Sequence, residues 1–245
     1  MDRGGQWGRT LAVMLVLVWP HPAAAGGEVI SEAAAARWRA VGALNAGGHR
    51  ACSAALISDH EAITAAHCVV NRTTGQRVAP EDFQLVLGQT AAGSAAVRGV
   101  RAVAFPPGYT AAEQTAGIAG LATDIALLEL DAPVSPQEAV PLQVVDWPAP
   151  VGDLADIVGY ERGGPEAATV RAGCRAVASV AGVTAVTCDV IPGLSGAAVL
   201  LQQSPADPPK LVASVSSRST GGGSALAFVV SVAPHLTELR ALIEK

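Results

Sequence analysis

About a dozen short apolar segments follow one another along the chain, and each is bounded by residues that form turns. Turn formers gather in stretches such as 45–48 (NAGG), 106–109 (PPGY) and 161–166 (ERGGPE). Segments of this length and spacing are typical of an all-β barrel or sandwich. The expected strands lie within 37–45, 52–58, 62–66, 83–88, 100–105, 124–130, 154–160, 175–180, 184–188, 197–201, 211–217 and 226–232.

Helical patterning is sparse in this sequence. Leucines recur at helical spacing over 234–244, behind Pro234, and predict a terminal helix. Residues 64–68 could add one helical turn. The glycine-rich segment 219–224 lacks the lysine and the strand-to-helix context of a phosphate loop, so we expect a surface loop or bend.

The composition allows a sizeable core, because 50% of the 245 residues are hydrophobic and only 15% are charged. Disorder throughout the chain is therefore excluded, and one or two domains are expected. The formal charge of −5, with no basic stripe, argues against a nucleic-acid partner.

Residues 1–25 have the pattern of a signal peptide. Arg3 and Arg9 precede an apolar run, and small residues lead to a predicted cleavage site after Ala25. The run is shorter than the roughly 20 residues of a permanent membrane helix. We therefore expect a secreted or periplasmic protein with no membrane partner after signal removal.

The chain has four cysteines, an even number that suggests disulfides in an exported protein. No Cys-x-x-Cys pair suggests zinc, and no metal is expected. We favour Cys52 with Cys68, and Cys174 with Cys188. A hairpin that turns at Ala181-Gly182 would bring the ends of the second pair together. The other two connectivities remain open from the sequence.

His67, Asp124 and Ser195 each stand at a patterned position. Alone, each residue type is more often structural: a core histidine, a turn or capping aspartate, a loop serine. Together they supply the hydroxyl, the base and the orienting carboxylate that hydrolysis of an acyl bond needs. Their order along the chain is His, Asp, Ser.

Three motifs carry these residues: CSAALISDHEAITAAHC at 52–68, TDIALLEL at 123–130 and PGLSG at 192–196. In this order they resemble the trypsin-like (chymotrypsin-fold) serine proteases. The similarity also takes in 211–217 and 226–243, and so extends over 37–245. The alanine-rich, cysteine-poor chain resembles secreted bacterial members.

The resemblance implies an all-β fold of two six-stranded antiparallel β-barrels with the active site between them, followed by a short C-terminal α-helix. One protease domain would then occupy 26–245. Its first barrel would span about 37–135, its second about 136–232, and its helix about 234–244.

The resemblance also implies the roles of the site residues. His67 would act as general base and then acid, Asp124 would hold its tautomer, and Ser195 would attack the substrate carbonyl. The backbone N–H groups of Gly193 and Ser195 would form the oxyanion hole, and no cofactor is implied. Ser214 matches the family's serine that hydrogen-bonds the aspartate, although it could equally be an ordinary strand serine.

Leu194 departs from the family pattern, in which digestive trypsins carry an aspartate before the nucleophile. That aspartate pairs with a new amino terminus after zymogen cleavage, and leucine cannot form the pair. We hypothesise that packing of Leu194 holds the oxyanion loop instead.

Asp189 stands six residues before Ser195, where trypsin carries the carboxylate that selects Lys or Arg substrates. A solvated or structural aspartate is the alternative, because Cys188 and Ile191 alter the local cysteine framework. Glutamate specificity in related bacterial enzymes tends to involve a histidine near the strand that lines the cleft, and the corresponding residue here is Ala213. The candidate pocket residues are Asp189, Ser214, Val215 and Ser216.

The leading hypothesis is an exported, monomeric serine endopeptidase that acts on protein or peptide substrates. The first rival is a protease-like binding module that keeps the fold without cutting. The second, a structural or cell-envelope β-domain, predicts none of these motifs.

Overall fold

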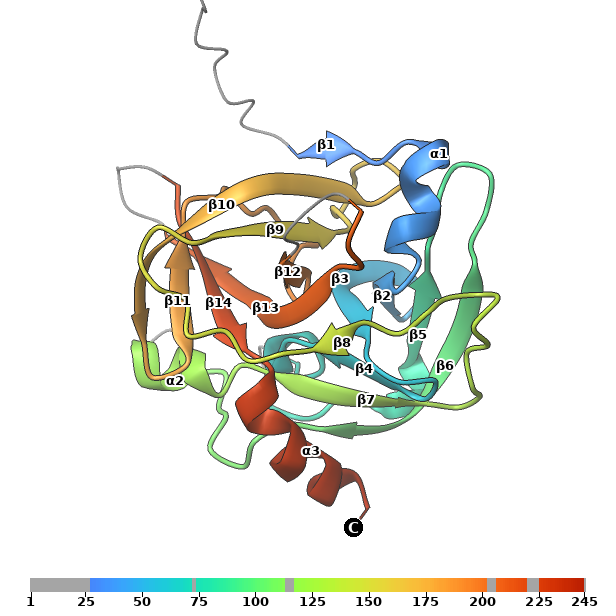
Figure 1. Cartoon of the computed structure of the whole chain (residues 1–245). Coiled ribbons are helices and arrows are strands. Elements are labelled where there is room, and N and C mark those ends of the chain that lie inside the picture. The colour runs from blue at the N-terminus through green and yellow to red at the C-terminus, as the bar shows by residue number, and fades with distance from the viewer. Residues whose placement is uncertain (1–26, 72–73, 113–116, 202–205, 220–224, 245) are drawn as a thin grey trace, which may run out of the picture.

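Two β-barrels lie side by side in the computed structural model, one built from strands within residues 41–130 and the other mostly from strands after residue 142 (Figure 1). The structure describes residues 27–71, 74–112, 117–201, 206–219 and 225–244. The predicted fold class, two six-stranded antiparallel barrels with a C-terminal helix, is confirmed. The predicted signal peptide lies outside the described residues.

The first barrel closes in the order β2-β3-β4-β7-β6-β5, and all its neighbouring strands are antiparallel. Closure leaves no open sheet edge, which protects a β-protein from edge-to-edge association. Leu44, Leu85 and Leu127 are fully buried in its core. The strands are β2 (Val41–Ala46), β3 (His49–Leu56), β4 (Glu61–Thr64), β5 (Phe83–Leu87), β6 (Ala96–Ala104) and β7 (Ala126–Leu130).

The second barrel follows the order β10-β11-β14-β13-β12-β9 and closes because β9 pairs with β10. Two short strands that the sequence did not predict extend this sheet: β1 lies antiparallel to β10, and β8 parallel to β13. The six barrel strands are β9 (Leu154–Gly159), β10 (Thr169–Val180), β11 (Val183–Val186), β12 (Ala198–Leu201), β13 (Lys210–Arg218) and β14 (Ala227–Ser231). The additional strands are β1 (Glu28–Val29) and β8 (Gln143–Val144).

Both favoured disulfides are present, one in each barrel: Cys52–Cys68 and Cys174–Cys188. The second spans the β10–β11 hairpin, as expected. The hairpin turns at Ala181 and Gly182, whose φ angles of 50° and 78° are those of a tight hairpin turn. Each disulfide is therefore local to its own barrel.

Helical structure is limited to short pieces apart from the C-terminal helix α3 (Leu236–Ile243). Two short helices, α1 (Glu32–Ala35) and α2 (Ile118–Ala122), were not predicted. Single 3-10 turns lie at Ala36–Trp38, Ala66–Cys68, Pro80–Asp82 and Ala233–His235. Among the described residues, no helix is both long enough and apolar enough to cross a membrane.

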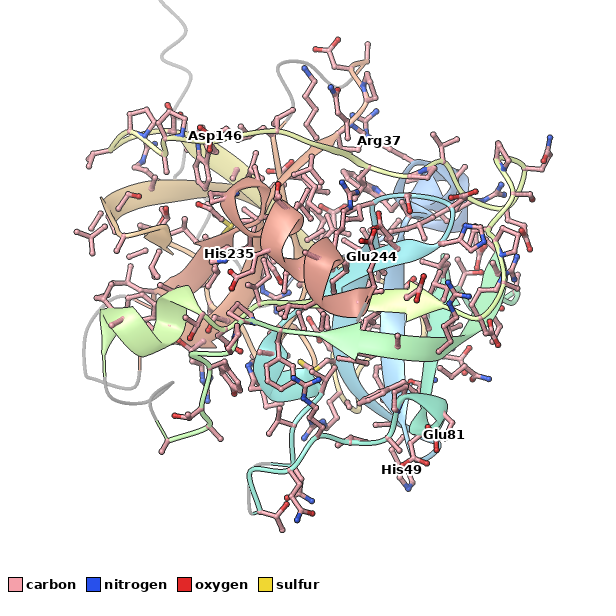
Figure 2. The ribbon with its side chains drawn as sticks, turned by 90° about the horizontal axis from the view of Figure 1, so that it is seen from below. Arg37, His49, Glu81, Asp146, His235 and Glu244 are labelled. Atoms are coloured by element: carbon pink, nitrogen blue, oxygen red, sulfur yellow. A yellow bond between two sulfur atoms is a disulfide. The ribbon has the colours of Figure 1, made fainter. Side chains whose placement is uncertain are left out.

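Helix α3 follows the last strand of the second barrel but packs on β6 and β7 of the first. Figure 2 looks onto this helix, with His235 at its start and Glu244 beyond its end. Leu239 is fully buried in the core cluster that contains the first barrel. Arg240 Nη2 lies 2.7 Å from Glu61 Oε2 on β4, and its hydrogen bonds lower the pKa of Glu61 against the effect of burial. The helix thus joins the two barrels.

Leu239→Ala should lower the free energy of unfolding by about 2–5 kcal/mol, because it leaves a cavity beneath α3. The exposed Thr237 on the same helix provides the control, and Thr237→Ala should stay within about 0.5 kcal/mol of the wild type. Urea unfolding followed by circular dichroism measures both. Equal effects would contradict the docking of this helix.

Candidate active site

His67 lies in the 3-10 turn Ala66–Cys68, directly after β4, and is 5% exposed. The Cys52–Cys68 disulfide ties this turn to β3. A ring nitrogen and the two sulfurs lie within 4.8 Å of one another, but the sulfurs are bonded together and offer no thiolate for a metal. The disulfide therefore acts as a brace beside the imidazole.

Asp124 is fully buried between α2 and β7 and accepts several hydrogen bonds. Its Oδ2 lies 2.8 Å from His67 Nδ1 and also accepts from the Ser216 hydroxyl, while its Oδ1 accepts from the His67 amide at 2.9 Å. Burial raises the pKa of Asp124, but the His67 and Ser216 contacts outweigh it and leave the pKa below its usual value.

The ionised Asp124 fixes the tautomer of His67. A carboxylate can only accept hydrogen bonds, so the imidazole proton must sit on Nδ1. The lone pair is then on Nε2, where a base needs it. Asp124 thus orients the ring and would stabilise the imidazolium after proton uptake.

Ser195 lies in the turn before β12 of the second barrel, and this turn makes hydrogen bonds to both barrels. Its carbonyl accepts the Ser53 amide of the first barrel at 2.8 Å, and the next amide, Gly196 N, donates to Val215 O of the second at 2.7 Å. Gly196 has φ +77°, and a Cβ there would lie 2.2 Å from Ser53 O and from Thr64 Oγ1. Only glycine allows this close contact.

The backbone around Gly193 bears on the predicted oxyanion hole. Pro192 O accepts the Arg162 amide at 2.8 Å, and in a trans peptide the Gly193 N–H points the opposite way. The Gly193 carbonyl accepts the Ser53 hydroxyl at 3.0 Å. Neither the Gly193 nor the Ser195 amide donates to an acceptor within the described residues, so both are available to an oxyanion.

His67 and Ser195 line one cleft of about 750 Å³ between the barrels. The first barrel also contributes Ala51 and Cys52, and the second contributes the C-terminal end of β13 and the loop before Ser195. Asp124 lies behind His67, away from solvent. His67, Ser195 and Asp124 thus come from three separate parts of the chain, and their catalytic roles stay a prediction.

The family model described as Trypsin matches residues 28–188. The chain belongs to the trypsin family. The matched range includes His67 and Asp124 and ends seven residues before Ser195, so the structure alone relates the serine to the other two. No curated protein matches the chain at the significance applied.

The hydroxyl that supports Asp124 in this trypsin-family chain belongs to Ser216, not to Ser214 as predicted. Ser214 pairs with Ala198 and Val230 inside the barrel, and its Oγ has no partner among the described residues. The pairing register shifts between Val215 and Ser217, which makes Ser216 the extra residue of a β-bulge. A bulge re-aims a side chain, and a residue count along the strand does not reveal it.

Leu194 is fully buried in the core of the second barrel. A Cβ on Gly159 would lie 3.0 Å from its side chain, so leucine fills the space beside β9. The oxyanion loop is also held by polar contacts, since Arg171 Nε donates to Asp189 O at 2.5 Å. Leu194 is thus packed in the core, and its role in holding the oxyanion loop stays a hypothesis.

Asp189 does not lie among the described residues that line the cleft, although Val215 and Ser216 do. Its Oδ1 faces Arg218 Nη1 at 3.9 Å. This differs from the proposed base of a pocket for Lys or Arg side chains. The neighbouring Val190 and Ile191 line the cleft instead, and Arg218 adds a positive charge to the lining.

Sequence reasoning missed several residues that organise the site. Ser53 lies in the motif at 52–68, but its contacts with the turn that carries Ser195 depend on the folded chain. Arg162, Arg171 and Arg218 stand in loops or at strand ends, where their targets depend on the folded chain.

Ser216→Ala should raise the pKa of Asp124, because a hydrogen bond to the ionised form is lost. A carboxyl group whose pKa is lowered in the folded state stabilises the fold at pH values above its ordinary pKa of about 3.9. This stabilisation is lost as the pH falls through the pKa of the folded state. The variant should lose about 1.5–3 kcal/mol at neutral pH and begin acid unfolding at higher pH. Urea unfolding between about pH 3 and 7 measures this.

Ser214→Ala is the matched control for Ser216→Ala. It removes a buried hydroxyl that no described residue engages, and it should leave the acid limb of the stability profile in place. Equal shifts in the two variants would contradict the assignment of Ser216.

Proposed function

We propose that this protein is a secreted serine endopeptidase that hydrolyses peptide bonds through an acyl-enzyme. The observation that carries the proposal is the pairing of His67 with the buried Asp124 in the cleft that Ser195 also lines. The trypsin family consists typically of serine endopeptidases that act on proteins. Location outside the cytoplasm is part of the proposal and is supported by the predicted signal peptide. We also propose that the protein acts as a monomer.

In the proposed mechanism, the Ser195 hydroxyl attacks the substrate carbonyl and transfers its proton to His67 Nε2. The amides of Gly193 and Ser195 donate to the oxyanion of the tetrahedral intermediate; removing one such donor typically costs about 10²–10³ in rate. His67 then protonates the leaving amine, and the acyl group remains on Ser195. Water, deprotonated by His67, releases the acid product.

A fluorophosphonate probe should label the mature protein at Ser195. Ser195→Ala should abolish labelling, whereas Ser179→Ala, which removes an exposed hydroxyl on β10, should leave it unchanged. His67→Ala should slow turnover by roughly 10⁶, because base and nucleophile act as a unit. A folded wild-type protein that the probe does not label would favour the binding module.

The N-terminal segment provides a test of the proposal that Leu194 replaces the zymogen ion pair. Residues Glu28 and Val29 pair with β10 on the outside of the second barrel, and Ile30 N donates to Ala168 O. Deleting 26–29 from the mature protein should produce no sharp gain in labelling rate. Sudden activation on deletion would contradict the role given to Leu194.

A further inference from the structure

The charges that line the cleft differ in sign from those of the whole protein. The chain has 16 basic and 21 acidic residues and a formal charge of −5. Among the described residues that line the cleft, the ionisable side chains are His67, Arg162 and Arg218, and no carboxylate is present. The cleft is therefore a basic region on an acidic protein.

Arg218 ends β13 on the second-barrel wall of the cleft, and its side chain is 51% exposed. It faces Asp189 at 3.9 Å, which is longer than a hydrogen bond, and it makes no hydrogen bond to the described part of the chain. Asp189 compensates part of its charge, but the planar fork of N–H donors can still bind a carboxylate that enters the cleft.

Arg162 follows β9 and lies against the first barrel. Its Nη2 donates to Ala51 O at 2.9 Å, which positions the guanidinium at the cleft. Ala51 and Arg162 also line an adjoining depression of about 490 Å³, together with His49 and Arg50. The basic character thus extends beyond the cleft on the first-barrel side.

The acidic side chains near the cleft are engaged by other groups: Asp189, whose side chain is 36% exposed, lies 3.9 Å from Arg218, and two others are held inside the protein. Asp124 is fully buried against His67 and Ser216. Glu161 accepts from Arg171 at 3.0 Å and from Thr169 at 3.1 Å. A substrate lysine would therefore meet positive charge with no exposed partner in the described lining, and a like charge is disfavoured.

We propose that this cleft selects peptides that carry acidic side chains close to the bond to be cut, with Arg218 and Arg162 as the specificity-determining residues. The preference in binding depends only on the charges of the cleft. A matching preference in cleavage rests on the proposed function. Exposed charges also steer association, so the preference should weaken as salt increases.

Binding by Ser195→Ala protein tests the preference without any need for catalysis. Fluorescent peptides that differ only in Glu, Gln or Lys beside a central bond are titrated at low and high salt. We expect the Glu peptide to bind about tenfold more tightly than the Gln peptide, a difference of ~1.4 kcal/mol, and the Lys peptide to bind most weakly. Equal binding of all three would overturn the proposal.

Substitutions assign the preference to residues. Arg218→Gln and Arg162→Gln should each reduce the advantage of the Glu peptide, and Arg218→Glu should favour the Lys peptide. Arg175→Gln is the control, because Arg175 is an exposed arginine of β10 outside the cleft. Its substitution removes one positive charge, as Arg218→Gln does. A loss of preference in Arg175→Gln equal to that in Arg218→Gln would assign the effect to net charge and overturn the proposal.

Cleavage and labelling separate this proposal from the proposed function. Wild-type protein that labels with fluorophosphonate but cuts the Lys peptide fastest would overturn the acidic preference alone. Protein that does not label, yet binds the Glu peptide in an Arg218-dependent manner, would overturn the peptidase function and retain the preference.

Discussion

The contact between Ser53 and the nucleophile turn is the interaction on which the site depends. Ser53 belongs to the first barrel, and its amide, carbonyl and hydroxyl all lie against residues 193–196 of the second. The hydroxyl also accepts the Tyr160 amide at 2.8 Å. One residue thus holds Gly193, Ser195 and Gly196 relative to the barrel that carries His67.

The hydrogen bonds of the buried Asp124 carboxylate also depend on the contact between the two barrels. Asp124 and His67 come from the first barrel, but the Ser216 donor comes from β13 of the second. A buried charge is costly unless hydrogen bonds compensate for it. Asp124 is therefore well accommodated only when the barrels have come together, and the folded arrangement and the ionised carboxylate stabilise each other.

The sequence predicted the repetitive features well, because they follow from local chemistry. Each expected strand segment overlaps a strand of the structure, and the His67, Asp124 and Ser195 motifs are consistent with one cleft. The two short strands β1 and β8 carry too few residues for a periodic pattern. Their pairing depends on neighbours distant in the chain.

Other parts of the site could not be read from the sequence. Ser214 and Ser216 lie two residues apart on one strand, so alternation gives both the same face, and the bulge decides between them. Asp189 stands at the expected distance from Ser195 in the sequence, but in the fold it faces Arg218 and is not among the described residues that line the cleft. Long-range geometry, not residue type, determines these roles.

The two disulfides are each confined to one barrel, so no covalent crosslink between cysteines spans the interface. Cohesion between the halves relies on hydrogen bonds, on core packing and on the docking of α3. On gradual denaturation, the halves can separate while each remains internally tied. The geometry around Ser195 would then be lost before the bulk of the β-structure, and rejoining the halves would restore it without any rearrangement of disulfides.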